Sequence, residues 1–207
     1  PSTSADSLPR VVSDGDAVIA AGWFEGTLDL DGKLLTSAGG KDVFVVKLDA
    51  AGDVVWGVSF PGVGDARVEA LGASTGGSVV VAGAFEGTMD MGAGLITSAG
   101  GLDAFAVKLD SNGNTLWSNR YGDAADQAAT GAGSDPSGDV TLAGSFEGSI
   151  DFGSGAQQSA GKRDVFVAKL SAQGSELWSG RYGGLGDDRA LAVTVDAAGN
   201  VWSSGHF

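Results

Sequence analysis

Short apolar runs alternate with polar, glycine-rich segments along the whole chain, and their order repeats every sixty-one residues. The repeat is plainest in three stretches that begin with aspartate and end with tryptophan. They are residues 42–56 (DVFVVKLDAAGDVVW), 103–117 (DAFAVKLDSNGNTLW) and 164–178 (DVFVAKLSAQGSELW). A fixed period without insertions is typical of repeat architectures, in which each copy is one supersecondary unit.

Each repeat contains four apolar runs of strand length. The first, for example 67–73, is followed by a glycine turn and a second run that ends in Gly-x-Phe, as in 78–85. The third run, for example 43–48, is almost continuously apolar, which indicates a strand buried on both faces. A turn at Gly52 and its equivalents then leads into a fourth run that carries the repeated tryptophan. The pattern predicts four antiparallel strands in hairpin order in every unit.

Four hairpin-connected strands per repeat are typical of a β-propeller blade, so the predicted fold class is an all-β propeller. A β-solenoid or a β-sandwich is the alternative, but solenoid coils are usually shorter and a sandwich does not repeat in sequence. The predicted organisation is a linker or trimmed leader at 1–10, blades at 11–65, 66–126 and 127–187, and the first two strands of a fourth blade at 188–207.

Three blades and part of a fourth fall short of the usual propeller count. Closed propellers have about 4 to 8 blades, so we expect an incomplete ring. The chain is then expected to be a piece of a longer array or one part of an assembly. Its open blade edges would invite pairing with strands of another chain.

The pattern VAGxFEGTxDxG followed by SAGGxDxFxxKLDxxGxxLWxxxYGG is carried most fully by residues 81–122. It resembles the bacterial β-propeller repeats of the SBBP type, which occur in surface and secreted proteins, and the strand order resembles that of NHL-type propellers. The resemblance implies a propeller at the cell surface or outside the cell. Unit 1 departs from the pattern at Phe60-Pro61, where the other units have Tyr-Gly, so its fourth strand is expected to end differently.

Composition narrows the classes of partner. Twelve basic and twenty-six acidic residues give a net charge of −14, which opposes binding to nucleic acid or to an anionic membrane surface. No run of about 18 apolar residues is present that could insert into a bilayer. Without cysteine the chain has no disulfide, thiolate nucleophile or thiolate metal ligand. Cations and basic partners fit this composition better.

In a propeller of this strand order the tight turns lie on one face and the long loops on the other, and the long-loop face is acidic. Three carboxylates recur there in a glycine-rich setting that would suit a hard cation such as calcium. The candidate metal ligands are Glu25, Asp29, Asp42, Glu86, Asp90, Asp103, Glu147, Asp151 and Asp164. The alternative interpretation is structural, because an aspartate before a strand or in a turn commonly accepts backbone N–H bonds.

Other recurring residues have structural explanations. The tryptophans at 56, 117 and 178 are expected to fill the gap between neighbouring blades, and the lysines at 47, 108 and 169 to pair with carboxylates or to extend along the blade edge. Trp23 and Trp202 break the repeat and would mark a contact surface. His206 has no cysteine or second histidine for a zinc site, and neither a GxSxG elbow nor a phosphate-binding loop is present.

These observations predict a non-enzymatic module without a catalytic residue. Its expected role is an interaction or structural scaffold whose acidic loop face meets a cation, a glycan or a protein. One alternative is a protomer that assembles edge to edge into a ring or filament. The other is a lyase or hydrolase with a site at the ring centre, but such a site should break the repeat symmetry, and the units differ chiefly by small apolar changes.

Overall fold

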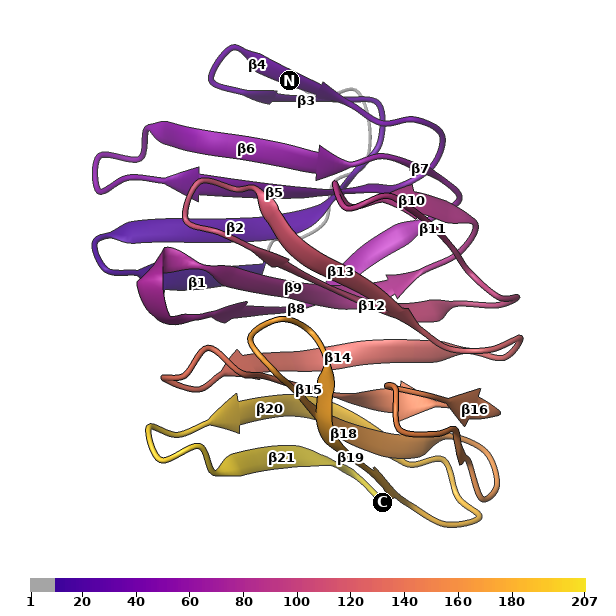
Figure 1. The fold of residues 1–207 in the computed structure, drawn as a ribbon. Coiled ribbons are helices and arrows are strands. Elements are labelled where there is room, and N and C mark those ends of the chain that lie inside the picture. Colours follow the sequence, from indigo (N-terminus) through magenta and orange to yellow (C-terminus); the bar gives the residue numbers. More distant parts are fainter. Residues whose placement is uncertain (1–9) are drawn as a thin grey trace.

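The computed structural model describes residues 10–207, without the side chain of Thr75, and shows an all-β protein (Figure 1). The linker or leader expected at 1–10 lies outside the described residues apart from Arg10, which begins the first strand. In the described part of the chain the helical element is a single short 3₁₀ turn, η1 (Thr75–Gly77).

Three four-stranded antiparallel sheets have the same hairpin order, as the repeat predicts. Unit 1 contains β1 (Arg10–Asp14), β2 (Ala17–Phe24), β5 (Asp42–Leu48) and β6 (Val54–Phe60). Unit 2 contains β8 (Ala66–Ala73), β9 (Val79–Phe85), β12 (Asp103–Leu109) and β13 (Thr115–Tyr121). Unit 3 contains β14 (Gln127–Ser134), β15 (Val140–Phe146), β18 (Asp164–Leu170) and β19 (Glu176–Tyr182). A two-stranded sheet follows, β20 (Arg189–Val195) with β21 (Val201–His206).

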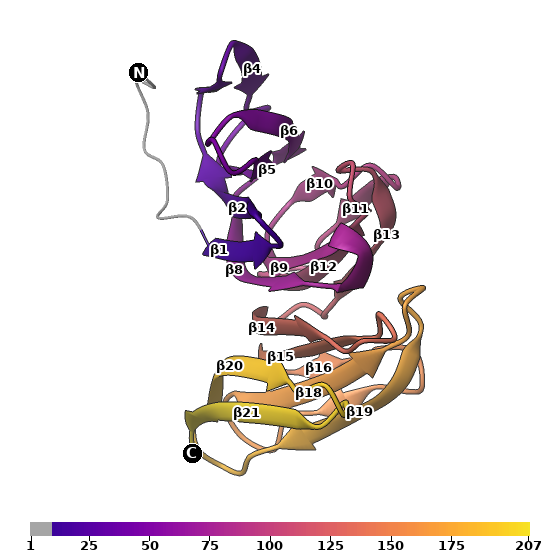
Figure 2. The same ribbon diagram turned by 90° about the vertical axis from the view of Figure 1, so that its left-hand side faces the viewer.

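The sheets stack face to face in chain order, with β3 and β4 at one end and β21 at the other (Figures 1 and 2). The described sheets do not close into a ring. The β1–β2, β5–β6, β14–β15 and β20–β21 turns lie on one side of the stack, and β7, β10 and the loop after β19 lie on the opposite side (Figure 1). The separation of tight turns from long loops therefore agrees with the strand order.

The tight hairpins are shaped by local chemistry. Asp49 Oδ1 accepts the N–H groups of Ala51 and Asp53 at 2.8 and 3.0 Å, and Gly52 has a φ of 90°. Glycine adopts this left-handed conformation without the penalty that a side chain would bring. The same aspartate-to-backbone turn recurs at Asp110, so the D-x-x-G spacing encodes the hairpin between the third and fourth strands.

The loop between the second and third strands, which the sequence pattern predicts only as a long polar loop, contributes to the core. It folds into a short hairpin in each unit: β3 (Thr27–Leu30) with β4 (Lys33–Thr36), β10 (Thr88–Asp90) with β11 (Leu95–Thr97), and β16 (Ser149–Ile150) with β17 (Gln157–Gln158). These segments bury Met89, Met91, Ile150 and Phe152. Polar and apolar residues alternate in residues 88–91 (TMDM) and 149–152 (SIDF). Because successive side chains of a strand point to opposite faces, every second side chain of these segments points into the core.

The fourth strand of unit 1 does not end differently from the others. β6 ends at Phe60, which is the position of Tyr121 and Tyr182 in units 2 and 3. The departure comes afterwards, where β7 (Gly62–Val63) pairs with β10 of the next unit. The Phe-Pro substitution therefore leaves the strand in place, and only unit 1 contributes an additional strand at this point among the described residues.

The core lies between the sheets as well as within them. One cluster joins units 1 and 2, and a second joins units 2 and 3. All seven residues of β12 are buried, which confirms the prediction for the third strand. A phenylalanine of the third strand packs across a glycine of the second strand. If Gly144 carried a side chain, its Cβ would lie only 2.0 Å from Ala128 O and 2.5 Å from the Phe166 ring. The Gly-x-Phe step thus makes room for this ring.

Candidate functional site

Tryptophan side chains bind each unit to the next. Trp56 Nε1 donates a hydrogen bond to Ser111 O at 2.9 Å, and its ring lies against Gly113, where a Cβ would come within 2.9 Å of it. Trp117 repeats the arrangement one unit later by donating to Ala172 O at 3.0 Å. The prediction that these rings fill the space between neighbouring units is confirmed at both positions.

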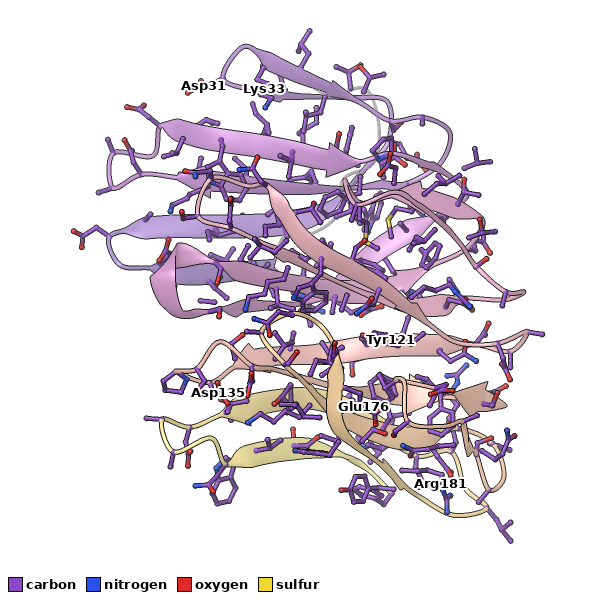
Figure 3. The ribbon with its side chains drawn as sticks, in the orientation of Figure 1. Asp31, Lys33, Tyr121, Asp135, Glu176 and Arg181 are labelled. Atoms are coloured by element: carbon purple, nitrogen blue, oxygen red, sulfur yellow. The ribbon has the colours of Figure 1, made fainter. Side chains whose placement is uncertain are left out.

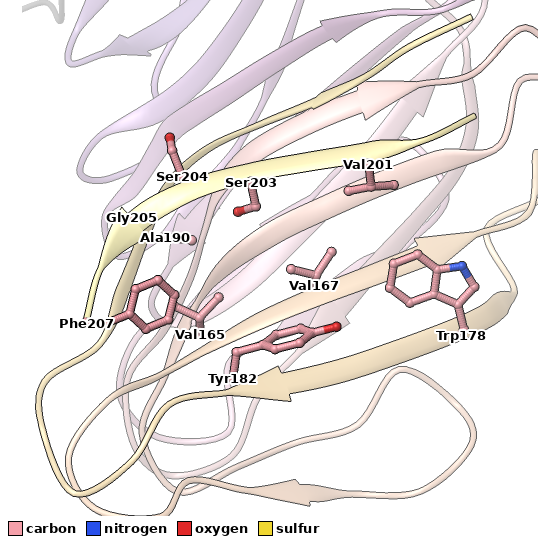
Figure 4. Close-up of a pocket in the computed structure, with 10 residues that line it drawn as sticks. All are labelled: Val165, Val167, Trp178, Tyr182, Ala190, Val201, Ser203, Ser204, Gly205 and Phe207. Atoms are coloured by element: carbon pink, nitrogen blue, oxygen red, sulfur yellow. The ribbon is translucent and has the colours of Figure 1, made fainter. Parts of the chain in front are cut away.

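The third tryptophan lies in a different environment. Trp178 is 41% exposed, whereas Trp117 is 8% exposed, and Tyr182 is 50% exposed, whereas Tyr121 is 5% exposed. Both exposed rings border a groove of about 300 Å³ between β18 and β19 on one side and β20 and β21 on the other (Figure 4). We call this groove, with the ten lining residues labelled in Figure 4, the end groove. None of the ten is a carboxylate, a histidine, a lysine or an arginine.

One unit earlier, the corresponding space is filled by unit 3. The Tyr121 ring packs against Phe152 with centroids 4.6 Å apart, and Phe152 packs against Phe166 at 5.2 Å. Ala168 and Leu170 of β18 belong to the same buried cluster. Tyr121 is labelled at this junction in Figure 3. Trp178 and Tyr182 thus form one wall of the end groove, as Trp117 and Tyr121 do at the junction of units 2 and 3. The end groove has no counterpart to the Phe152 and Phe166 side chains that fill that junction.

The recurring aspartates at the start of the third strands are buried and structural. Asp42 Oδ2 accepts the N–H of Ala38 at 2.7 Å, and Asp103 and Asp164 make the same bond to the residue four positions before them, at 2.9 Å each. Burial raises the pKa of Asp42, against the backbone hydrogen bonds that favour its charged form. These aspartates fix the approach of the loop to the third strand, as the turn-forming interpretation predicts.

The second oxygen of these aspartates distinguishes the units. Asp42 Oδ1 accepts the N–H of Gly62 at 3.2 Å. In unit 2 the corresponding N–H, that of Asp123, instead donates to Gln127 Oε1 at 3.2 Å, and Asp103 Oδ1 has no donor within the described part of the chain. Arg120 compensates the charge of Asp103 through the other oxygen. The role of Gln127 was not predicted from the sequence, although this residue replaces Ala66 of unit 1 in an otherwise regular repeat.

Several of the more exposed candidate calcium ligands also form hydrogen bonds or ion pairs within the chain. Asp29, Asp90 and Asp151 accept the N–H groups of nearby turn glycines at 2.7 to 2.8 Å. Glu147 pairs with Arg163 at 3.3 Å. Glu25 is half-buried, and Glu86 is exposed beside its hairpin.

Among residues 10–207 no group of three or more His, Cys, Asp or Glu side chains is placed to hold a metal ion. The nine predicted ligands are therefore not gathered into such clusters, and calcium binding stays a prediction. Other acids of the long-loop face are partly neutralised by neighbouring cations. Lys41 donates to Asp65 at 3.1 Å and lowers the pKa of that carboxyl, and Arg189 does the same to Asp187 from 2.8 Å.

The lysines of the third strands pair with carboxylates in two units. Lys47 lies 2.8 Å from Asp14, and Lys169 lies 2.7 Å from Asp135, each carboxylate being in the turn between the first and second strands. Unit 2 has Ser74 at the carboxylate position, and the buried Lys108 donates to Gly138 O of the next unit at 2.7 Å. Burial lowers the pKa of Lys108. The expected pairing is confirmed for Lys47 and Lys169 and is wrong for Lys108, because unit 2 lacks the partner.

The residues that break the repeat have different environments. Lys41 Nζ lies 4.9 Å from the centroid of the Trp23 ring, a cation–π arrangement within unit 1. Trp202 is strongly exposed on β21, and His206 is exposed at the end of the same strand. Trp202 thus remains a candidate contact residue beside the end groove.

No helix within residues 10–207 is long and apolar enough to cross a membrane. No protein-family model and no curated protein sequence matches this chain.

Proposed function

We propose that this protein is a non-enzymatic repeat module of the β-propeller type that acts as an interaction or structural scaffold, and that the end groove is the surface against which a further polypeptide segment packs. One observation carries the proposal: the end groove exposes Trp178 and Tyr182, whereas their equivalents Trp117 and Tyr121 are buried where units 2 and 3 meet. Large apolar patches that remain exposed on a folded domain are typical of protein interaction sites. The resemblance to bacterial surface repeats supports a role at the cell surface or outside the cell.

The lining of the end groove favours binding over catalysis. Its polar side-chain groups are the hydroxyls of Tyr182, Ser203 and Ser204 and the indole N–H of Trp178, without a charged group to act as a base or to stabilise a developing charge. The acidic loop face is a weaker candidate surface, because many of its carboxylates already accept backbone N–H groups or pair with cations. The end groove is therefore the better-supported binding surface.

The accessibility of the end groove can be tested with the fluorescent dye bis-ANS. We expect saturable binding of the dye to the full chain and a loss of most of that binding in Tyr182→Asp. Leu34→Asp is the matched control, since Leu34 is an exposed apolar residue of β4 at the opposite end of the stack. Dye binding that is absent, or that survives Tyr182→Asp, would contradict the proposal.

A further inference from the structure

A buried carboxylate oxygen in unit 3 lacks a hydrogen-bond donor. Asp164 begins β18, and its side chain is fully buried. Its Oδ2 accepts the N–H of Ala160 at 2.9 Å and pairs with Arg181, which Figure 3 labels. Its Oδ1 is buried as well and accepts no hydrogen bond within the described part of the chain. A buried charged oxygen without a partner is costly, so the groups around it indicate what would satisfy it.

A second buried carboxylate lies beside this oxygen. Asp188, in the loop between β19 and β20, is 5% exposed, and its Oδ2 accepts the N–H of Gly184 at 2.8 Å. If Gly183 carried a side chain, its Cβ would lie 2.6 Å from Asp188 Oδ2 and 2.7 Å from Asp164 Oδ1. Gly183 has a φ of 142°, which glycine adopts readily. The glycine therefore lets two carboxylate oxygens approach the same point of the backbone.

Unit 1 satisfies the equivalent oxygen and has no second acid. Asp42 Oδ1 accepts the N–H of Gly62 at 3.2 Å, and Ala66 stands at the position of Asp188. In unit 3 the N–H at the position of Gly62 is that of Gly184, and it donates to Asp188. The second carboxylate thus takes the donor that the first carboxylate has in unit 1.

Unit 2 has the geometry of unit 3 with one negative charge less. Gln127 stands at the position of Asp188. If Gly122 carried a side chain, its Cβ would lie 2.1 Å from Gln127 Oε1 and 2.7 Å from Asp103 Oδ1. An amide oxygen accepts hydrogen bonds as a carboxylate does, but it is uncharged. Unit 3 therefore places a full charge where unit 2 places a neutral acceptor.

The two carboxylates of unit 3 share one cationic side chain. Arg181 pairs with Asp164, and within residues 10–207 Asp188 has no lysine or arginine at ion-pair distance. The adjacent Arg189 pairs with Asp187 instead, at 2.8 Å. One negative charge is therefore left over beside a buried oxygen that lacks a donor.

We propose that Asp164 Oδ1 and Asp188 Oδ2 bind a monovalent hard cation, with sodium as the ion that fits this chemistry. The cation would satisfy the donorless oxygen of Asp164 and balance the charge of Asp188. Carboxylate and carbonyl oxygens are the ligands that hard cations take in proteins. A calcium ion takes about 6 to 8 oxygens, whereas this place offers two side-chain oxygens and one unbalanced charge.

The cation would join two parts of unit 3 that precede the last sheet. Asp164 belongs to β18, and Asp188 directly precedes β20, whose approach is also fixed by the bond from the Asp188 N–H to Arg163 O at 2.9 Å. Neither carboxylate lines the end groove, so this inference is independent of the proposed function. Its expected effect is on the stability of the loop between β19 and β20.

The first test is thermal unfolding of the full chain in sodium chloride and in choline chloride at equal ionic strength. Choline is too large to lie between the two oxygens, so the comparison separates binding from screening. Because a ligand that binds only the native state stabilises it, we expect the melting temperature to be higher in sodium by about 2 to 4 °C.

Two variants locate the ion. Asp188→Gln gives unit 3 the amide that unit 2 has at Gln127, and it should abolish the difference between sodium and choline. Asp187→Asn is the matched control, because it removes a neighbouring charge that is exposed and already paired with Arg189. This control should keep the difference. Sodium-23 NMR provides a readout that does not depend on unfolding: the full chain should broaden the sodium signal more than Asp188→Gln does.

The outcomes decide the proposal. Equal melting temperatures in sodium and choline, together with equal sodium linewidths for the full chain and Asp188→Gln, would overturn it. A sodium effect that survives Asp188→Gln would mean that the ion binds elsewhere and would overturn the assignment. Stability that ignores the cation but increases as the pH falls, with the increase lost in Asp188→Gln, would show that the two carboxylates share a proton instead.

Discussion

The interfaces between units predict an unequal response to the same substitution at equivalent tryptophans. Trp117→Ala removes a buried indole that packs against Gly174 and donates to Ala172 O at 3.0 Å. Truncation of a buried Trp costs about 3–5 kcal/mol. Trp178→Ala removes a ring that is 41% exposed and faces the end groove, so we expect a cost of about 1 kcal/mol.

The assay is urea denaturation followed by far-UV circular dichroism, which reports the sheets without depending on the tryptophans themselves. The expected difference between the two variants is about 2 kcal/mol or more, seen as a clearly lower midpoint for Trp117→Ala. Trp117→Phe should recover part of the loss, because it keeps an aromatic ring and lacks only the donor to Ala172 O. Equal losses for Trp117→Ala and Trp178→Ala would refute the reasoning, since they would mean that Trp178 is as well packed as Trp117.

Three further predictions concern other parts of the structure. Gly144→Ala should destabilise the protein by several times the cost of Gly184→Ala in thermal melts, because a Cβ at Gly144 would overlap Ala128 O whereas one at Gly184 meets nothing within 4 Å; equal melting temperatures would contradict this packing. Because burial lowers the pKa of Lys108, the charged lysine is less favourable in the native state than in the unfolded chain. This cost to the free energy of unfolding is complete below the folded-state pKa, where both states are protonated, and disappears above 10.5, where both are neutral. The stability of the wild type relative to Lys108→Met should therefore rise as alkaline pH approaches 10.5. A fall would mean that the pKa of Lys108 is raised in the native state. The turn-forming interpretation of Glu25, Asp29 and Asp42 predicts that millimolar calcium or a chelator leaves the melting temperature unchanged, since no three His, Cys, Asp or Glu side chains within residues 10–207 are placed to hold a metal ion; a calcium-dependent rise would support the calcium interpretation instead.

The repeat predicted the features that depend on spacing alone. The hairpin order, the burial of the third strand and the packing of Trp56 and Trp117 between units follow from a period without insertions. The pairing of Lys47 and Lys169 was also foreseen in kind, although the sequence did not indicate which carboxylate each would meet.

Features that depend on small differences between units were missed. The alternation in TMDM and SIDF was a sufficient signal for the inter-unit hairpins that bury Met89 and Phe152, but the glycine and serine content of the loop concealed it. Lys108 was expected to behave as its equivalents do, and Ser74 in place of an aspartate sends it to a carbonyl of the next unit. The end groove was not predicted, because most of its residues have the same types as those one unit earlier; Ser203 and Ser204, in place of the buried Leu142 and Ala143, are the exceptions.

Amide hydrogen exchange of the full chain, measured with and without saturating bis-ANS, tests most directly whether the end groove is an accessible apolar binding surface. We expect the amides of β21 to exchange more slowly when the dye is bound, while those of β2 at the far end of the stack are unchanged. Exchange in β21 that is indifferent to saturating dye would contradict the proposed role of the groove.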